Sequence, residues 1–316
     1  MRTLKDSEKV DYISRCLELA ILFEVSGYPK PGNIHRTADF SETIFEHYLA
    51  SAVAVEPSFR KAAKQGTKFL EGEIEASELG VGFLIKDAVN RMLYSQKGGN
   101  TLLGAIIILT PIATAAGMIN GKISLLELRK KIKVVVESTT PKDAIQTYEA
   151  IALVNPGGLN NSKELDVNDL KSKKKILDQG ITLFDTFKIA AAYDSIAYEW
   201  VNNYSVTFDL GYPYLFKELE KTGNLNTATV HTFLKILSEV PDTFISRKVG
   251  QIKAEKISIK AKNVLKHGGL STATGKQLLL EFDKTLRDPK NSLSPGTTAD
   301  ITEAVLAINN LMGYIP

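Results

Sequence analysis

The residues best suited to chemistry near the N-terminus form one short run, Pro29-Lys30-Pro31-Gly32-Asn33-Ile34-His35-Arg36. Each proline fixes φ and disfavours helical geometry in the residue before it, so this run must be an extended loop between two apolar helices. Glu24 precedes the loop and Asp39 follows it. A rigid loop that combines cations with carboxylates suits a phosphate-rich ligand bridged by a metal ion.

A second polar segment, Lys97–Ala105, opens the most apolar helix that the sequence predicts. Gly99, Asn100 and Thr101 would expose backbone N–H groups at the start of that helix, where the helix dipole also favours an anion. The alternative is an ordinary helix start, in which Asn100 or Thr101 is the N-cap. The local sequence leaves both interpretations open.

Two further places put charged side chains where a helical core has no need of them. Asp242 and Arg247 lie in the junction 240–250, where they could bind a ligand or form an ordinary N-cap and surface ion pair. Asp194 lies inside the apolar run Ile189–Trp200. A carboxylate there is costly unless it is paired, bound to a metal or turned toward water.

The last polar junction, Leu293–Asp300, leads into the final predicted helix. Ser294 and Gly296 precede the helix, and Asp300 falls in its first turn, where a carboxylate complements the helix dipole. If Asp300 instead faces a polar pocket, it could hold Mg²⁺, which binds a few carboxylates together with phosphate oxygens.

Helical periodicity dominates the elements that must position these residues. Residues 4–25 carry apolar side chains at Val10, Ile13, Leu17 and Ile21, which is the spacing of one helix face. Further helices are predicted at 41–56, 58–70, 79–96, 101–119, 124–137, 141–154, 182–203, 212–221, 226–239, 250–266, 271–287 and 297–312. The prediction is an all-α fold, a single compact domain of about a dozen helices over residues 1–316, with a long irregular segment at 154–170.

Composition excludes several classes of protein. The formal net charge of +3 over 316 residues is too small for a typical nucleic-acid-binding chain. Cys16 is the only cysteine, so no intrachain disulfide can form, which fits a cytoplasmic location. The apolar stretch 101–119 contains proline and glycine and is interpreted as a buried core helix, not a membrane span. Helical proteins of this size often form dimers, so a homodimer is expected.

Taken together and in this order, the polar segments resemble those of the triphosphoribosyl-dephospho-CoA synthase family, in an archaeal-type variant. The resemblance extends over almost the whole chain, and the Lys-Pro-Gly and Ser-Pro-Gly-x-x-Ala-Asp segments are its most specific parts. The matching residues are Glu24, Pro29–Asn33, Asp39-Phe40, Ser51-Ala52, Asn100-Thr101, Gly104-Ala105, Asp242-Thr243, Arg247, Ser294–Gly296 and Ala299-Asp300.

The resemblance implies an all-α transferase that uses ATP as a ribosyl donor and Mg²⁺ as a cofactor. The 2′-hydroxyl of dephospho-CoA, or of a related coenzyme precursor, attacks C1′ of ATP, and adenine leaves. An oxocarbenium-like transition state is expected at the anomeric carbon. The expected substrate-binding residues are Lys30, His35, Arg36, Gly99, Asn100, Thr101, Arg247, Ser294 and Gly296. The expected Mg²⁺ ligands are Asp39, Asp242 and Asp300, and the expected catalytic carboxylates are Glu24, Asp39 and Asp194.

This chain departs from the bacterial members in two places. It lacks their Gly-Ala-His insert after the Lys-Pro-Gly loop, and Leu102-Leu103 replaces the His-Lys that follows their Asn-Thr. Two other functions therefore remain open at the level of the sequence. One is a helical nucleotide hydrolase, and the other is a nucleotide-binding protein that has lost catalysis.

Overall fold

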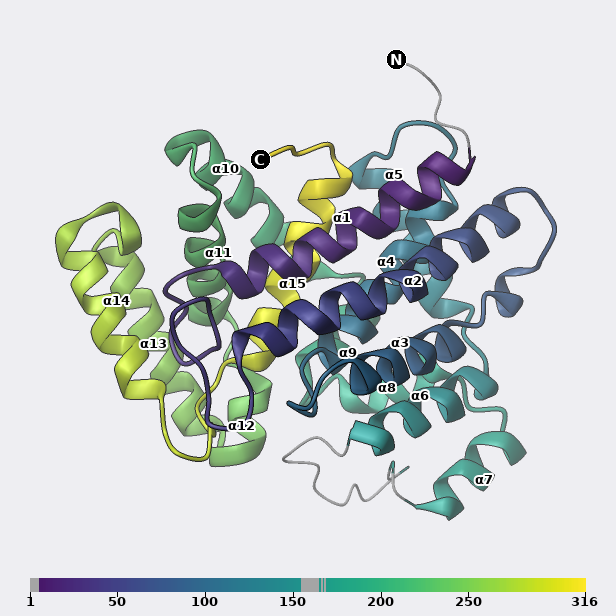
Figure 1. The fold of residues 1–316 in the computed structure, drawn as a ribbon. Helices are drawn as coiled ribbons and strands as arrows, with labels where there is room; N and C mark the ends of the chain where they lie inside the picture. Colours follow the sequence, from purple (N-terminus) through teal and green to yellow (C-terminus); the bar gives the residue numbers. More distant parts are fainter. Residues whose placement is uncertain (1–5, 155–164, 166, 168) are drawn as a thin grey trace.

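The computed structural model describes residues 6–154, 165, 167 and 169–316, and over these residues it contains α-helices, short 3₁₀ and π segments and no strand (Figure 1). The all-α prediction is therefore confirmed. Most of the irregular segment predicted at 154–170 lies outside the described residues. The described α-helices are α1 (Asp6–Ser26), α2 (Phe45–Leu70), α3 (Val81–Ser95), α4 (Leu103–Gly117), α5 (Leu125–Glu137), α6 (Pro141–Val154), α7 (Leu170–Asp178), α8 (Leu183–Ala190), α9 (Ser195–Val201), α10 (Tyr212–Thr222), α11 (Leu225–Glu239), α12 (Thr243–Val249), α13 (Gln251–Lys266), α14 (Ala273–Leu286) and α15 (Gly296–Leu311).

The helices differ from the prediction in at least four places, one of which is α7, a helix that was not predicted. The two helices predicted at 41–56 and 58–70 form one helix, α2, which continues through Pro57. The carbonyl of Val53 loses its helical donor there, but Val53 is 61% exposed, so water can satisfy that oxygen. The helix predicted at 182–203 is divided because Asp194 caps a new helix, α9. The short helix α12 was not predicted.

The helix α4 is the centre of the fold, and every one of its residues except Gly104 is buried. Pro111 lies inside it and has no N–H to donate to the carbonyl of Ile107. Trp200 Nε1 donates to that oxygen at 3.3 Å, and the hydroxyl of Tyr204 donates to the carbonyl of Ile108 at 2.9 Å. Side chains from outside the helix thus satisfy the interrupted part of α4, as the interpretation of a buried core helix requires.

Around this centre, α1, α2 and α15 pack against one another or against α4, and α13 and α14 lie together at one side of the molecule (Figure 1). A second apolar cluster joins α13 and α14 to α11 and α12. At the C-terminal end of α4, Lys9 Nζ donates to the carbonyls of Gly117 at 2.8 Å and Ile119 at 2.6 Å. A cation at that end stabilises the helix dipole.

Helices α2 and α4 cross in close backbone contact at one glycine from each helix. A Cβ on Gly117 would lie 2.0 Å from the carbonyl oxygen of Ala63, and one on Gly66 would lie 2.0 Å from that of Thr114. Gly117→Ala is therefore expected to lower the free energy of unfolding by about 1–3 kcal/mol, measured by denaturant unfolding. Gly296→Ala is the control, because its Cβ would meet only the Phe244 ring, at 3.7 Å. Equal stability of the two variants would contradict the close crossing.

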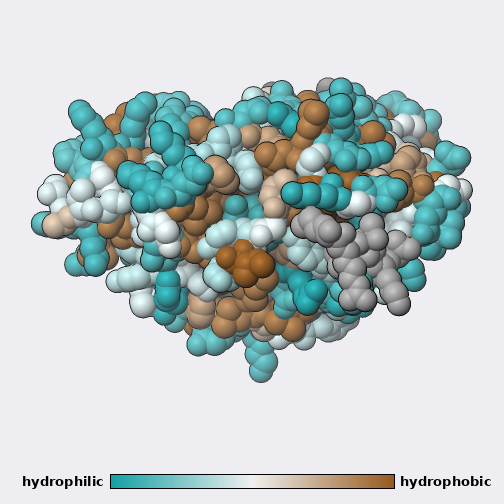
Figure 2. Space-filling model, turned by 90° about the horizontal axis from the view of Figure 1, so that it is seen from above, coloured by the Kyte–Doolittle hydropathy of each residue, from teal (hydrophilic) through white to brown (hydrophobic). Residues whose placement is uncertain are grey.

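The surface carries mostly hydrophilic side chains interrupted by apolar patches, as Figure 2 shows for the face seen from above. Among the described residues, none of the helices is both long and apolar enough to cross a membrane. Cys16 is a free, buried cysteine. The predicted homodimer and cytoplasmic location stay predictions.

Candidate active site

A cavity of about 1110 Å³ lies where the C-terminal end of α1 meets the N-terminal ends of α4, α9, α12 and α15. Segments far apart in the sequence therefore converge on one cavity. The predicted site residues that line the cavity are Glu24, Asn100, Thr101, Asp194, Arg247, Ser294, Gly296 and Asp300. Those that do not line it are Lys30, His35, Arg36, Asp39, Gly99 and Asp242.

Three carboxylates line one part of this cavity: the buried Glu24 from α1, the buried Glu303 from α15 and the half-buried Asp300 from α15. A Cβ on Gly104 would lie 2.0 Å from Asp300 Oδ2, so the carboxylate packs directly on the first turn of α4. The backbone N–H of Ala105 favours the ionised form of this carboxylate. Burial and the neighbouring carboxylates, including Glu24, raise the pKa of Asp300 well above its usual range.

Lys30 lies behind this carboxylate group, fully buried, and does not line the cavity. Its Nζ donates to Glu24 Oε1 at 2.5 Å. Burial lowers the pKa of Lys30, and the neighbouring Glu24 carboxylate opposes that shift. Lys30 was predicted to contact phosphate. Its ammonium instead neutralises a cavity carboxylate, because an unpaired charge at this depth would be far more costly than a paired one.

Cationic side chains line another part of the cavity. Arg247 forms an ion pair with Asp194, which also caps α9 by accepting from the N–H groups of residues 196 and 197 at 2.9 and 3.0 Å. Lys248 Nζ donates to the carbonyl of Asn291 at 3.3 Å and lies 4.2 Å from the centre of the Phe244 ring. Burial lowers the pKa of Lys248. Both cations stand where an anionic group in the cavity could reach them.

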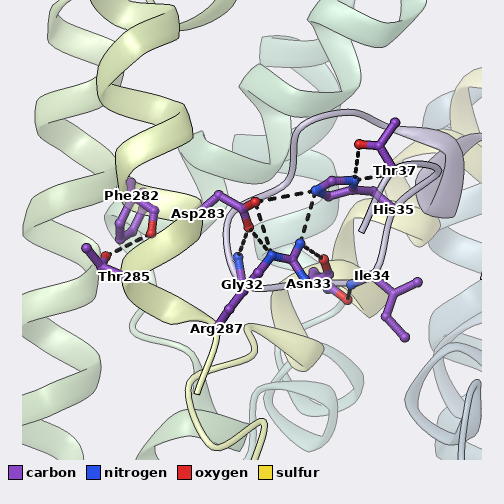
Figure 3. Close-up of polar contacts among 9 residues, drawn as sticks. All are labelled: Gly32, Asn33, Ile34, His35, Thr37, Phe282, Asp283, Thr285 and Arg287. Carbon is purple, nitrogen blue, oxygen red and sulfur yellow. Dashed lines mark hydrogen bonds and ion pairs between the residues drawn. The ribbon is translucent and has the colours of Figure 1, made fainter. Parts of the chain in front are cut away.

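The Pro-Lys-Pro-Gly loop is held against α14 by a polar network (Figure 3). Asp283 Oδ1 accepts from the N–H of Gly32 at 2.8 Å, and Arg287 Nη2 donates to the carbonyl of Asn33 at 2.7 Å. Arg287 also contacts His35 Nε2 at 3.0 Å. His35 is buried in this network and thus supports the loop, whereas Asn33 lines the cavity.

Three other predicted residues lie at the surface. Arg36 is exposed and donates to Asn226 Oδ1 at 2.6 Å. Asp39 is exposed and accepts from the N–H of Phe45 at 2.8 Å, at the start of α2. Gly99 is exposed as well, and its carbonyl accepts from a glutamine side chain. The structure does not bring these three residues to the cavity.

Asp242 is buried, and the backbone uses both of its carboxylate oxygens. Oδ1 accepts from the N–H of Ile245 at 3.0 Å, and Oδ2 accepts from the N–H and the hydroxyl of Thr298, each at 2.8 Å. It caps α12 and ties that helix to α15. Among the described residues, no three histidine, cysteine or acidic side chains form a group that could hold a metal ion. The predicted Mg²⁺ ligand set of Asp39, Asp242 and Asp300 is therefore not assembled.

The prediction that Asn100 or Thr101 is the N-cap of α4 is wrong, because Leu102 takes that position. Asn100 Oδ1 nevertheless accepts from the N–H of Leu103, the first residue of the helix, at 3.1 Å. Thr101 Oγ1 lies 2.7 Å from Ser51 Oγ. Both Asn100 and Thr101 also line the cavity, so one segment starts the helix and forms part of the wall. Ser294 does the same before α15.

Comparison with known proteins identifies the family of this chain. The ATP:dephospho-CoA triphosphoribosyl transferase family matches residues 10–315. The chain belongs to this family of transferases. Among similar proteins, 2-(5''-triphosphoribosyl)-3'-dephosphocoenzyme-A synthases, so named provisionally, occur in Pseudomonas aeruginosa PAO1 and Streptococcus equi subsp. equi strain 4047. The first is 24% identical, over 92% of this chain and 88% of its own length, and the second is 26% identical, over 92% and 93%.

Protein CitXG of Leuconostoc mesenteroides subsp. cremoris is 24% identical over 93% of this chain, which spans 58% of that longer protein. A crystal structure from Archaeoglobus fulgidus, provisionally described as a triphosphoribosyl-dephospho-CoA synthase, superposes with a TM-score of 0.61 at 23% identity. It covers 84% of this chain and 100% of the archaeal one. This likeness shows a shared fold.

In this triphosphoribosyl transferase family member, the polar cavity residues that sequence reasoning missed include Tyr48, Lys248 and Glu303. A signal for Glu303 was available, because it lies three residues after Asp300 and therefore on the same helix face. It is also a carboxylate in a helix whose residues are nearly all buried. Lys248 had no such signal, since it is one of many lysines beside a helix end.

Proposed function

We propose that this transferase moves the triphosphoribosyl group of ATP to the ribose 2′-hydroxyl of dephospho-CoA, or of a related coenzyme precursor, and releases adenine. One observation carries the proposal: buried carboxylates and cations line the same cavity. Transfer at C1′ requires anionic groups beside a ribose that becomes positively charged, and cations beside a triphosphate. Glu24 and Asp300 supply the first, and Arg247 and Lys248 supply the second.

Asp300 is the residue best suited to accept the proton of the attacking hydroxyl. The close contact with Gly104 fixes the position of its carboxylate, and a fixed base needs little reorganisation during the reaction. Glu24 forms a buried ion pair with Lys30, and its carboxylate lies where it can stabilise positive charge on the ribose. The family description, ATP:dephospho-CoA triphosphoribosyl transferase, supports ATP and dephospho-CoA as the substrates.

Magnesium enters this proposal as part of the MgATP substrate. The three predicted protein ligands do not gather, since Asp39 is at the surface and the backbone occupies both oxygens of Asp242. Mg²⁺ commonly keeps several waters and binds through substrate phosphates. No step of the proposed reaction depends on a resident metal site.

Mass spectrometry of the products from MgATP and dephospho-CoA tests the proposal. Free adenine together with a dephospho-CoA adduct that carries a triphosphoribosyl group is the expected result. ADP, or free ribose triphosphate formed without acceptor, would indicate a nucleotide hydrolase. Tight ATP binding without turnover across a panel of coenzyme precursors would indicate a binding protein that lacks catalysis.

Lys248→Met is expected to raise KM for MgATP roughly tenfold or more, because a hydrogen bond to a charged group contributes about 1.5–3 kcal/mol. Steady-state kinetics with MgATP as the varied substrate measures the change. Lys253→Met is the matched control, since Lys253 lies five residues further on at an exposed position of α13 and does not line the cavity. An unchanged KM in Lys248→Met would remove Lys248 from the triphosphate site.

A further inference from the structure

Glu303 is a buried carboxyl group in the cavity without a partner for one of its oxygens. It lies on α15 one turn beyond Asp300, lines the cavity and is 2% exposed. Within the described residues, its Oε2 has no hydrogen-bond partner. A buried polar atom without a partner is costly, and in an enzyme it marks a place that a ligand atom completes.

The groups around Glu303 determine which ligand atom fits. Glu24 of α1 and Asp300 of α15 are neighbouring carboxylates, and Tyr48 of α2 faces the same group. Lys30 is the cation on this side, and its Nζ lies 2.5 Å from Glu24 Oε1. Burial and the two carboxylates raise the pKa of Glu303 well above its usual range, and Lys30 opposes that shift. These surroundings favour the protonated form of Glu303, which can donate into the cavity that the side chain lines.

We propose that Glu303 is the proton donor to the departing adenine, an assignment that rests on the proposed transfer reaction. A ring nitrogen of adenine is a hydrogen-bond acceptor, which is what a protonated and unpartnered Oε2 requires. A carboxyl group kept neutral by its surroundings is suited to general acid catalysis at neutral pH. The two neighbouring carboxyl groups on one face of α15 then share one proton and have different tasks. Asp300, which packs on Gly104, is the ionised partner and takes a proton, whereas Glu303, whose Oε2 has no partner among the described residues, gives one.

The step balances in atoms and electrons. The C1′–N9 bond of ATP breaks and its electron pair stays on the base, while Glu303 transfers its proton to a ring nitrogen. The 2′-oxygen of the acceptor forms a bond to C1′, and its proton passes to Asp300. Neutral adenine leaves, Glu303 is ionised, and Asp300 is protonated. Transfer of one proton from Asp300 to Glu303 restores the starting state.

The test compares wild type with Glu303→Gln, which keeps the shape of the side chain but has no acidic proton. With dephospho-CoA as acceptor, kcat is expected to fall about 100-fold or more, whereas the Kd for MgATP changes less than about threefold. The alkaline limb of the pH profile of kcat, which reports loss of the donor's proton, should disappear in the variant. Glu199→Gln is the matched control, because Glu199 is also buried but lies outside the cavity.

Donor analogues provide a measurement that needs no variant. The 3-deaza and 7-deaza analogues of ATP each lack one ring nitrogen that can accept the proton. Wild type is expected to turn over one of them slowly, and Glu303→Gln should lower that rate no further. Two results overturn the assignment: a kcat of Glu303→Gln within threefold of wild type with its alkaline limb kept, or both analogues reacting with wild type as fast as ATP.

Failure of this assignment can be told from failure of the proposed function. If wild type releases no adenine from MgATP with dephospho-CoA or any other acceptor, the transfer reaction and the role of Glu303 both fall. If wild type releases adenine and the Glu303→Gln variant does so equally fast, only the role of Glu303 falls.

Discussion

Gly104→Ala is expected to lower kcat about 100-fold or more, although it adds only one uncharged methyl group. The new Cβ would lie 2.0 Å from Asp300 Oδ2 and 2.4 Å from its Cγ, so the carboxylate must move. Asp300 lines the cavity, so its carboxylate can only move away from Gly104 by turning into that cavity, out of its present position. The displaced carboxylate would no longer face the attacking hydroxyl, which steady-state kinetics at saturating substrate measures.

A double-mutant cycle shows whether Gly104 acts through Asp300. If it does, Gly104→Ala combined with Asp300→Ala should be no slower than Asp300→Ala alone, because the group that the methyl displaces is already absent. Multiplied effects of the two substitutions, or a kcat of Gly104→Ala within tenfold of wild type, would contradict the packing of this carboxylate on α4. Circular dichroism at the assay temperature confirms that each variant is folded.

Lys30→Met is expected to lower the free energy of unfolding by about 3–5 kcal/mol. Lys30 and Glu24 are both buried, with 0% and 2% of their side chains exposed, and their contact is 2.5 Å long. Removal of the ammonium leaves the Glu24 carboxylate buried beside Glu303 and Asp300 without its cation. Denaturant unfolding monitored by circular dichroism measures the loss.

Two comparisons make the Lys30 prediction specific. Lys30→Met combined with Glu24→Met should recover most of the lost stability, since replacement of a whole buried ion pair by apolar side chains is far less costly than removal of one partner. Lys61→Met breaks the ion pair with Asp87, in which the lysine is 45% exposed, and should change stability by less than about 1 kcal/mol. A loss in Lys30→Met no larger than in Lys61→Met would show that the buried pair is not a major source of stability.

Helical periodicity predicted most of the fold because it is a local property. Residues 6–26 and 125–137 form helices within two residues of the predicted ends, since their apolar spacing and end residues act within a few turns. The prediction was wrong at 182–203, where Asp194 starts a second helix by accepting from two backbone N–H groups. It was wrong at Pro57 as well, because exposure of the preceding turn makes the missing N–H tolerable.

The polar junctions were a sound guide to the cavity but a poor guide to individual roles. Arg247 and Asp300 line it as expected, whereas Asp242 has the residue type of a metal ligand and the contacts of a helix cap. Lys30 was assigned to phosphate on its charge, yet its neighbour Glu24 decides where its ammonium points. The role of each of these side chains depends on contact partners that are distant in the sequence or that only the fold brings into reach.

The sequence by itself determined the helical character of this protein, the loop at 29–36 and the family to which the chain belongs, because these follow from residue types and their spacing. Only the tertiary structure decided which carboxylates share a cavity and which are used as caps. The pKa of a side chain is set by burial and by groups within a few ångströms. For Glu303 these groups include Glu24 and Lys30, which are more than 250 residues away in the chain.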